Sequence, residues 1–470
     1  MASKAKEEIK TVHGQPAKDF FVNMLTRDIE LHDALLDLLD NCVDGALRTR
    51  GPAKKSADSL SGFWAKITFN ENRFVIEDNC GGIPWNIARD YAFKMGKPPS
   101  TAKPEGTIGV VGIGMKRAIF KLGRECFLHS NHKDDTFLVT ISPQWFLNDS
   151  LWEFPAERER AHSKNFGTII EISELTPAAK LAFRKDSNFR QTFPKIVGES
   201  YAYLIEKGFR VEVNNEPVRH EPVRLCFEYP DEPGQSSGRI RPYLYTAKVN
   251  GVDVFLAVGY RSGLKTEQEL EDDKEVSFHA RQAGWTIVCN DRVVLSHDRT
   301  VTTGWGVAGA PNFHNQFSCI AGIVEFRAAE TALLPVTTTK RGIDAGKDIY
   351  TIIRPHMQAG LKQFTKNTNR WRGFETELRE RFSKANYLDL RQLREIASKT
   401  KMTALRSERD EKQFSPRLPE KQALKTSTRI SFLRSTKDVQ RVSLHLFGEV
   451  RKGGDVGAEC FDRILKEART

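Results

Sequence analysis

The chain has 470 residues, of which 39% are hydrophobic and 28% are charged, and its formal net charge at pH 7 is +11. This composition is typical of a soluble globular protein of two or three domains. It argues against a membrane protein, because no apolar run approaches the roughly 20 residues that a transmembrane helix requires. The polar N-terminal stretch has no apolar run behind it, so we expect no secretory signal. Seven dispersed cysteines without a C-x-x-C pair favour a reducing, cytoplasmic location.

The positive charge is unevenly distributed along the chain. Residues 1–360 contain 46 Lys+Arg and 46 Asp+Glu, whereas residues 361–470 contain 26 and 15. The whole excess therefore lies in the last quarter, which predicts an anionic partner there, nucleic acid being the usual one. A solubilising helical surface would account for the same charge.

Turn-rich segments suggest how the chain divides into domains. Residues 1–14 are expected to form a tail, and 15–230 a first domain that mixes helices and strands. The sequence DEPGQSSG at 231–238 is a break. A second α/β domain is expected over 239–385, followed by a basic helical region over 386–470.

The expected elements alternate between helical and strand periodicity. For the first domain we predict helices at 16–24, 28–47, 113–122 and 188–206, and strands at 63–69, 73–77, 125–129, 136–141, 168–172, 210–213 and 223–229. For the remainder we predict strands near 243–249, 252–258, 285–290 and 320–326, helices at 348–385 and 388–398, and a polar linker at 407–422.

The predicted helix at 28–47 combines an apolar stripe with an unusual number of carboxylates. Its apolar residues recur at helical spacing and should face a core: Leu31, Leu35, Leu38, Leu39 and Val43. Its other faces carry Asp33, Asp37, Asp40, Asn41 and Asp44. Steps of four residues align Asp33, Asp37 and Asn41 on one line. These carboxylates repel one another, so a metal ion, an activated water or donors from elsewhere would explain them.

A first glycine-containing segment follows the second predicted strand. Its sequence, DNCGGIP at 78–84, places Asp78 at the strand end, where a carboxylate can accept a hydrogen bond from the amino group of a base. The adjacent glycines let a flat ring approach the backbone closely. An ordinary Asx turn would explain this segment equally simply.

A second glycine-rich segment, at 106–117, leads into the predicted helix at 113–122. Glycines before a helix expose backbone N–H groups, and the helix dipole favours a phosphate there. Lys116 would add a point charge. The segment is neither a Walker loop nor a dinucleotide fingerprint, since it lacks G-x-x-x-x-G-K-[ST] and follows a proline-rich loop rather than a strand.

Taken together, the order and spacing of these motifs are distinctive. An acidic helix with Asp40-Asn41, then Asp-x-x-Gly-Gly at 78–82, then Gly-x-x-Gly-x-Gly at 109–114 resembles the GHKL ATPases over about residues 20–175. This superfamily includes gyrase B subunits, MutL proteins, the ninety-kilodalton heat-shock chaperones, histidine kinases and the microrchidia ATPases. The resemblance implies an α+β protein with a Bergerat-type sandwich domain, a transducer (S5-like) domain and a helical tail.

The resemblance also implies ATP and Mg²⁺ as ligands. It assigns Asn41 to the metal, Asp78 to the adenine amino group, Thr168 to the support of Asp78, and 94–108 to the ATP lid. Cys80 departs from the family pattern, because it stands where the first glycine of D-x-G-x-G usually lies. The further nucleotide-binding positions implied are Gly82, Ile83, Gly109, Gly112, Ile113, Gly114, Met115 and Lys116.

Asp37 is a second departure, four residues before Asn41, where hydrolytic members carry a glutamate that activates water. A carboxylate there is a sound general base, but aspartate is one methylene shorter. Misplacement by about 1 Å can cost on the order of a hundredfold in rate, so we predict a slow ATP hydrolase with Asp37 as base. The alternative is a protein that binds ATP without hydrolysing it.

The segment LLPVTTTKR at 333–341 precedes the predicted helix at 348 and looks like the transducer loop of gyrase-like, MutL-like and microrchidia-like members. In those proteins a loop lysine points toward the γ-phosphate, and Lys340 is our candidate. A single cation there can sense whether the third phosphate is present. A surface Lys-Arg pair is the simpler alternative.

Two other clusters are not expected to have a function. Cys126, His129 and His132 have ligand-like spacing, but in a strand His129 would point away from the other two. The acidic run at 267–275 is expected to be a solvated loop.

The functional hypothesis is an ATP-dependent conformational switch or dimer clamp that acts on nucleic acid, in genome maintenance or bacterial defence. The resemblance implies that ATP closes the lid, Lys340 docks and two protomers meet through their N-terminal domains. A chaperone-like clamp on a protein partner is the main alternative. A signalling kinase is disfavoured, because we find no phosphoacceptor histidine helix before the first domain. No membrane association is expected.

Overall fold

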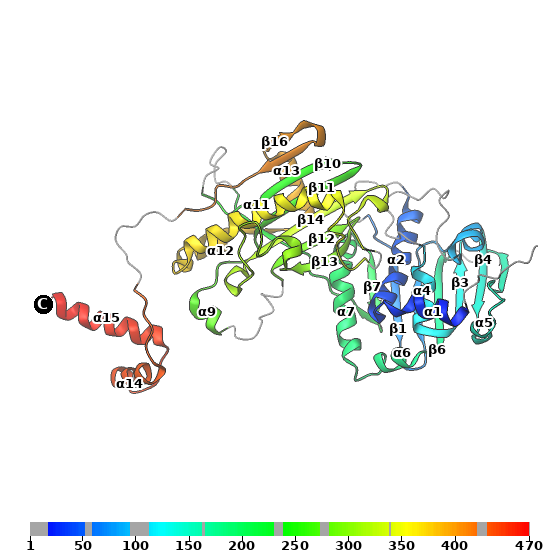
Figure 1. Ribbon diagram of the computed structural model, residues 1–470, viewed down its shortest axis with the longest axis horizontal. Coiled ribbons are helices and arrows are strands. Elements are labelled where there is room, and N and C mark those ends of the chain that lie inside the picture. Colours follow the sequence, from blue (N-terminus) through cyan, green and yellow to red (C-terminus); the bar gives the residue numbers. More distant parts are fainter. Residues whose placement is uncertain are drawn as a thin grey trace, which may run out of the picture. The chain divides into compact units, whose positions relative to one another are not determined.

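The structure is a computed structural model. It describes residues 17–51, 59–94, 112–161, 165–229, 238–272, 282–337, 340–420 and 430–469. The chain divides into two compact units, 1–420 and 421–470, and the first of these contains two domains (Figure 1). None of the helices in the described ranges is long and apolar enough to span a lipid bilayer.

The first domain is built on a mixed sheet with the strand order β5-β4-β3-β6-β2-β1-β7-β8 among the described residues. β1 and β7 run parallel, and the other described neighbours run antiparallel. The strands are β1 (Trp64–Phe69), β2 (Phe74–Asp78), β3 (Gly123–Asn131), β4 (Asp135–Ile141), β5 (Ala156–Arg160), β6 (Gly167–Leu175), β7 (Arg210–Val213) and β8 (Glu216–Pro217).

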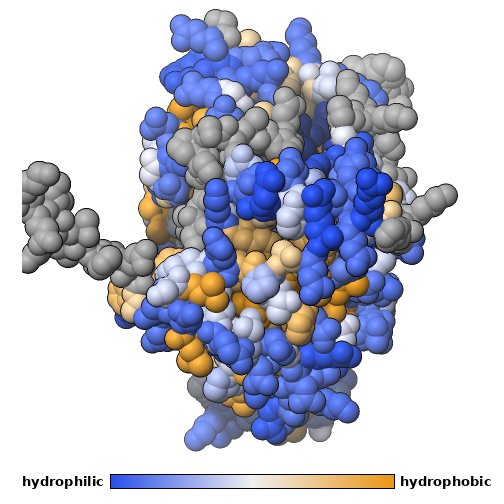
Figure 2. Space-filling model, turned by 90° about the vertical axis from the view of Figure 1, so that its right-hand side faces the viewer, coloured by the Kyte–Doolittle hydropathy of each residue, from blue (hydrophilic) through white to orange (hydrophobic). Residues whose placement is uncertain are grey.

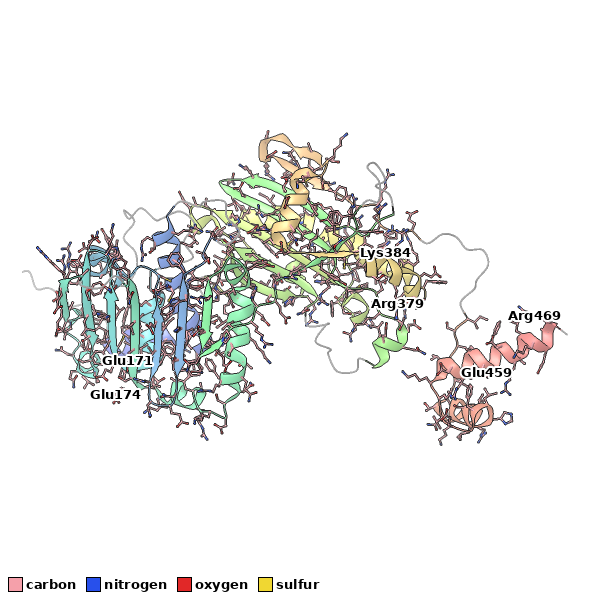
Figure 3. All side chains as sticks on the ribbon, turned by 180° about the vertical axis from the view of Figure 1, so that it is seen from behind. Glu171, Glu174, Arg379, Lys384, Glu459 and Arg469 are labelled. Atoms are coloured by element: carbon pink, nitrogen blue, oxygen red, sulfur yellow. The ribbon has the colours of Figure 1, made fainter. Side chains whose placement is uncertain are left out.

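Helices cover one face of this sheet and leave the other open (Figures 1 and 3). Side chains alternate between buried and exposed along β1 and over much of β3, as expected for a sheet with one solvated face. Glu171, on β6, forms an ion pair with Arg73 at 3.3 Å and is labelled in Figure 3. The helices are α1 (Lys18–Arg27), α2 (Leu31–Arg50), α3 (Trp85–Ile87) with a π-turn (Ala88–Ala92), α4 (Gly114–Leu122), α5 (Pro143–Leu147), α6 (Pro177–Ala182), α7 (Asn188–Ser200) and α8 (Ala202–Glu206).

Helix α2 is the central helix of this domain. Its predicted apolar stripe is largely confirmed, since Leu35, Leu38, Leu39 and Val43 are buried, although Leu31 is only partly so. The helix ends at Gly51, which adopts a left-handed φ of 72° that an L-residue would reach only at a cost. The helix predicted over 188–206 is in fact interrupted at Tyr201, so α7 and α8 are separate.

The second domain contains a sheet with the described strand order β13-β12-β14-β11-β10-β17-β16. The long helix α11 contacts β10, β11 and β14 and buries its apolar residues against this sheet. The strands are β9 (Leu225–Phe227), β10 (Tyr243–Val249), β11 (Val252–Tyr260), β12 (Gly284–Cys289), β13 (Arg292–Asp298), β14 (Ile320–Ala328), β15 (Asn386–Leu388), β16 (Thr403–Arg406) and β17 (Glu411–Phe414); the helices are α9 (Glu267–Asp272), α11 (Asp348–Trp371), α12 (Glu375–Lys384) and α13 (Leu390–Lys399).

The structure corrects the expected helical region that begins at residue 386. β17 pairs antiparallel with β10, and β16 pairs with β17, so both belong to the second sheet. β15 pairs with β9 in a small separate sheet. The predicted domain boundary at 385 and the predicted polar linker at 407–422 are therefore wrong. The first compact unit continues to residue 420, because β17 pairs with the otherwise open edge of β10.

Two smaller expectations also differ from the structure. The helix predicted over 348–385 ends at Trp371, and α12 begins after Gly373, which has a φ of 80°. The acidic run at 267–275 was expected to be a solvated loop, but it begins with the short helix α9. Glu267 forms an ion pair with Arg372, just after α11, at 3.3 Å, and Glu269 forms one with Arg379 of α12 at 2.6 Å.

The second compact unit is a helical hairpin of α14 (Thr436–Phe447) and α15 (Gly453–Arg469). Ser435 begins α14 as its N-cap, and Gly448 ends it in a left-handed conformation. Among its described hydrophobic residues Val456 is buried, whereas Leu444, Phe461 and Ile464 are at least half exposed.

Candidate functional site

The acidic residues of α2 occupy distinct environments. Asp37 and Asp40 are buried, with 4% and 1% of their surface exposed, whereas Asn41 is exposed. Because successive positions on a helix turn by about 100°, Asn41 can face solvent while Asp40 faces other elements. Asp37, one turn before Asn41 on nearly the same line, is buried because Arg117 and Lys340 cover it. The helix thus presents an amide to an open face and two carboxylates to its neighbours.

The Asp37 carboxylate is held from both sides by cations. Arg117, on α4, places Nη2 2.6 Å from Oδ2, and Lys340 places Nζ 3.5 Å from Oδ1. Gly114 lets α4 approach closely, because a Cβ at this position would lie 3.0 Å from Cγ of Asp37. The glycine thus allows the start of α4 to pack directly on the acidic helix.

Asp40 lies at the centre of a buried ionic cluster that joins the two domains. Lys340 donates to Oδ2 at 2.7 Å; Arg292 and Tyr201 donate to Oδ1 at 3.0 and 2.6 Å. Burial alone would raise the pKa of Asp40, but the Lys340 ammonium and the Arg292 guanidinium outweigh it and lower that pKa. Burial likewise opposes the charge on Lys340, yet Asp40 and Asp37 raise its pKa. The cluster therefore stays charged at neutral pH.

Asp78 is fixed at the end of β2 by backbone donors. The N–H groups of Cys80 and Thr168 both donate to Oδ1, at 2.7 and 3.3 Å, and Asp78 is paired with Thr168 in the β2–β6 register. Burial is the largest cause of a raised pKa for this carboxyl group. The hydrogen bonds hold the side chain in one orientation.

The two glycines after Cys80 are both needed where they stand. Gly81 and Gly82 have φ angles of 91° and 70°, which favour glycine. A Cβ on Gly82 would lie 2.3 Å from the backbone oxygen of Asn131. The N–H of Ile83 donates to Ser130 at 2.7 Å. A side chain at 82 would therefore prevent packing of this turn against β3, and a side chain at 81 would collide with Thr49 of α2.

The glycine-rich segment is described from Gly112 onward. Gly112 has a φ of 73°, Ile113 is the N-cap of α4, and Gly114 and Met115 form its first turn. The predicted site residue Gly109 and all but the first residue of the predicted lid at 94–108 lie outside the described residues. The first turn of α4 directs backbone N–H groups at the N-terminal end of the helix, which suits a phosphate.

Lys116 differs from its expected role. The side chain is buried with 1% exposure, and its ammonium group donates to the carbonyl oxygens of Ala92, at 2.9 Å, and of Gly112. It thus ties the loop before α4 to the end of the π-turn. The point charge that we predicted for a phosphate serves the loop backbone in this structure.

Sequence reasoning missed the cations that neutralise the acidic helix. Arg117 lies within the glycine-rich segment, and Arg292 lies just beyond the strand expected near 285–290. Arg341, the neighbour of Lys340, pairs with Asp33 at 3.1 Å. The one available signal was charge balance, since buried carboxylates require cationic partners from some other part of the chain.

No cluster of three or more His, Cys, Asp or Glu suited to a metal ion occurs in the described ranges. Cys126 is buried and His129 exposed, which agrees with their expected opposite directions on β3. The exposed amide of Asn41 together with phosphate oxygens fits Mg²⁺, which usually takes one or two protein ligands plus substrate phosphates and water.

Comparison with known families agrees with this geometry. Residues 29–171 match the family described as histidine kinase-, DNA gyrase B- and HSP90-like ATPase. No curated protein matches the chain. The matched region runs from the start of α2 to β6 and includes Asp37, Asn41, Asp78 and Thr168. By this match residues 29–171 form an ATP-binding domain of the GHKL superfamily.

Proposed function

We propose that this protein is an ATP-dependent conformational switch that binds ATP with Mg²⁺, hydrolyses it slowly and acts as a homodimeric clamp on nucleic acid. The observation that carries the proposal is the contact of Lys340, from the second domain, with Asp37 and Asp40 of α2 in the first. A loop lysine at this place can couple the nucleotide state of one domain to the position of the other.

The proposed binding site combines three parts of the first domain. Asp78 accepts a hydrogen bond from the adenine amino group, and the fixed orientation of its carboxylate favours adenine over bases that lack a donor at that position. Gly81 and Gly82 allow the ring to approach the backbone, and the first turn of α4 donates N–H groups to the phosphates. Asn41 holds Mg²⁺, which neutralises phosphate charge when bound.

In the proposed reaction, Asp37 accepts a proton from water as the water oxygen bonds to the γ-phosphorus. The bond from that phosphorus to the bridging oxygen breaks, and ADP leaves with the electron pair. Arg117 and Lys340 engage the two oxygens of Asp37, so at least one of these contacts must loosen before the carboxylate can act. This requirement, with the shorter aspartate side chain, supports a slow rate.

Lys340 is proposed as the group that senses the third phosphate. Lys340 is 8% exposed, and its ammonium group is held mainly by Asp40 at 2.7 Å. A bound γ-phosphate would compete with Asp37 and Asp40 for this cation. Because Arg292 also pairs with Asp40, a shift of Lys340 leaves the carboxylate compensated rather than alone.

An exposed apolar surface supports the proposed dimer. Phe20 and Met24 on α1 are 63% and 54% exposed, and Leu147 on the neighbouring α5 is 86% exposed. Figure 2 shows apolar side chains gathered on the face at the end of the domain where α5 lies. Contiguous apolar surface on a soluble protein commonly marks an interaction site.

The charge distribution supports nucleic acid as the partner. Residues 421–470, which form the second compact unit, contain 11 Lys+Arg and 6 Asp+Glu. Residues 361–420 add a further excess, 15 against 9. Basic segments bind the phosphate backbone with little sequence dependence and a strong dependence on salt.

A non-hydrolysing ATP sensor that acts on a protein partner is the second candidate. The observation that favours it is the pairing of both Asp37 oxygens with cations, which reduces the carboxylate's availability as a base. Phosphate release separates the two candidates. Turnover that is lost in Asn41→Ala and in Asp37→Asn supports the hydrolase, whereas ATP binding without any turnover supports the sensor.

The clamp is tested by molecular mass in solution. Light scattering after gel filtration, with and without a non-hydrolysable ATP analogue, should show a dimer only with the analogue. Repeating the measurement with duplex DNA at two salt concentrations tests the partner. A dimer that binds unfolded protein but not DNA would replace nucleic acid by a protein partner in this proposal.

A further inference from the structure

A cavity of about 570 Å³ lies in the first compact unit and contains none of the proposed ATP-site residues. The segment that leads from the first domain into β9 forms one wall, and residues of the second domain form the rest. The volume falls in the range of small-molecule sites. Its lining includes Glu221, Arg224, Arg261, Ser262, His297 and Tyr387.

Cationic and hydrogen-bonding groups dominate this lining. Arg224 and Arg261 carry fixed positive charges, and Glu221 is the one carboxylate among the described lining residues. Arg261 donates to the side-chain oxygen of Gln282, and the amide nitrogen of Gln282 donates to Glu221. Gln282 thus links Arg261 to Glu221. The cavity is left with a net positive charge.

His297 is the most unusual residue of the cavity. It lies on β13 with a φ of 50°, a left-handed conformation that is strained for a residue with a side chain. Its Nδ1 atom is buried and has no hydrogen-bond partner among the described residues. Burial, followed by the nearby Arg261, lowers the pKa of His297 to about 4.

At neutral pH this imidazole is therefore uncharged, and its buried nitrogen lacks the partner that a buried polar atom normally has. Because that nitrogen is buried, the rest of the imidazole lines the cavity. Strained backbone conformations are concentrated at binding sites and active sites.

We propose that this cavity is a second ligand site, separate from the ATP site, for a phosphate monoester of about nucleotide size. Guanidinium groups bind phosphate through paired N–H donors, and Arg224 and Arg261 both line the cavity. His297 and Ser262 supply further hydrogen bonds. Tyr387, which is half exposed, offers an aromatic face for a ring attached to the phosphate.

The test uses the full chain with Asp78→Asn, which impairs the adenine pocket, and calorimetric titration with uridine 5′-monophosphate and, separately, inorganic phosphate. Uridine monophosphate lacks the adenine amino group and so does not depend on Asp78. We expect it to bind, and inorganic phosphate to bind more weakly. The Arg261→Gln change should weaken binding of the nucleotide at least about tenfold, the loss of one charge-assisted contact.

Two further variants keep the test informative if Arg261→Gln disturbs the fold. His297→Asn should weaken binding while preserving the backbone, because asparagine tolerates a left-handed φ. Arg219→Gln is the matched control, since Arg219 is exposed on the same segment but does not line the cavity. It should bind as the parent does.

The proposal is overturned if neither probe binds at millimolar concentration, or if Arg261→Gln and His297→Asn bind as well as the control. It is also overturned if uridine monophosphate binds the wild type but not the Asp78→Asn chain, since the ligand would then occupy the ATP site. Binding of a 5′-phosphorylated oligonucleotide but of neither small probe would replace the small molecule by nucleic acid. None of these results depends on ATP turnover.

Discussion

Arg117 Nη2 lies 2.6 Å from Asp37 Oδ2, so the residue proposed as general base already forms an ion pair with a residue of α4. Both side chains are nearly buried, with 10% and 4% exposure. Removing one partner of a buried pair leaves an uncompensated charge, which typically costs 3–5 kcal/mol. Lys340 moderates that cost for Asp37, because it stands 3.5 Å from the other oxygen.

The pair is tested by a double-mutant cycle. Arg117→Gln and Asp37→Asn should each lower the urea midpoint of unfolding, and the double variant should lose less stability than the sum of the two. The coupling should be about 1–3 kcal/mol. Strict additivity would mean that the two side chains do not interact in solution.

Asp37→Asn should also stop ATP hydrolysis without preventing ATP binding. Asparagine keeps the shape of the side chain but cannot accept the proton of water, so turnover should fall about 10²–10⁴-fold. Phosphate release and a nucleotide-binding titration measure the two properties. Asp28→Asn, at an exposed position just before α2, is the matched control and should turn over ATP normally. Unchanged turnover in Asp37→Asn would assign the base elsewhere.

Lys340→Met should weaken both ATP turnover and the attachment of the second domain. The methionine fills a similar volume but leaves Asp37 and Asp40 with fewer cationic partners. We expect a loss of about 2–4 kcal/mol in stability, moderated because Arg292 still pairs with Asp40. Lys340→Arg keeps the charge and should be milder. Wild-type turnover and stability in Lys340→Met would argue against the coupling role.

Asp78→Asn should separate nucleotide binding from stability. Since burial raises the pKa of Asp78, the folded protein holds the ionised group at a cost whenever the pH lies above that folded-state pKa. The variant should therefore unfold at an equal or higher urea concentration at pH 7. This advantage should disappear as the pH falls through the folded pKa to the unfolded value near 3.9. ATP affinity should fall by about 10–100-fold through the lost charged hydrogen bond. Lower stability at pH 7 would mean that the ionised carboxylate is needed for folding.

Truncation tests the corrected domain boundary. A chain that ends at residue 420 keeps β16, β17 and α13 and should fold and turn over ATP, whereas one that ends at 385 exposes the edge of β10 and the apolar residues beneath α13. We expect the shorter chain to aggregate. If the basic hairpin binds DNA, the 1–420 chain should also show a smaller salt dependence of binding. A stable, active 1–385 chain would contradict the structural boundary.

Local periodicity predicted much of the fold. The apolar stripe of α2 and the strands β1, β2, β10 and β11 follow from residues that alternate or repeat at fixed spacing. β16 (TALR) and β17 (EKQF) were not predicted, because each has four residues and neither alternates regularly between apolar and polar side chains. They form strands because β17 pairs with the edge of β10 and β16 pairs with β17.

The candidate site was predictable only where a motif carried it. The order of the motifs identified Asp37, Asn41 and Asp78. The contacts with the second domain join residues that are far apart in the sequence: Lys340 and Asp40 are separated by 300 residues, and Arg292 and Asp40 by 252. Spacing in sequence holds no information about such contacts. A lysine beside glycines suggests a phosphate contact for Lys116, and its hydrogen bonds to two backbone carbonyls were not predictable from that pattern.

The pairing of β17 with β10 also constrains the order in which the chain can fold during its synthesis. As the chain leaves the ribosome, β10 and β11 emerge early, and β10 cannot gain its second neighbour until residues 411–414 have followed. Until then one side of a buried, hydrophobic strand stays open, a state prone to pairing with other nascent chains. Folding of the second domain is therefore completed late in translation, long after the first domain can close.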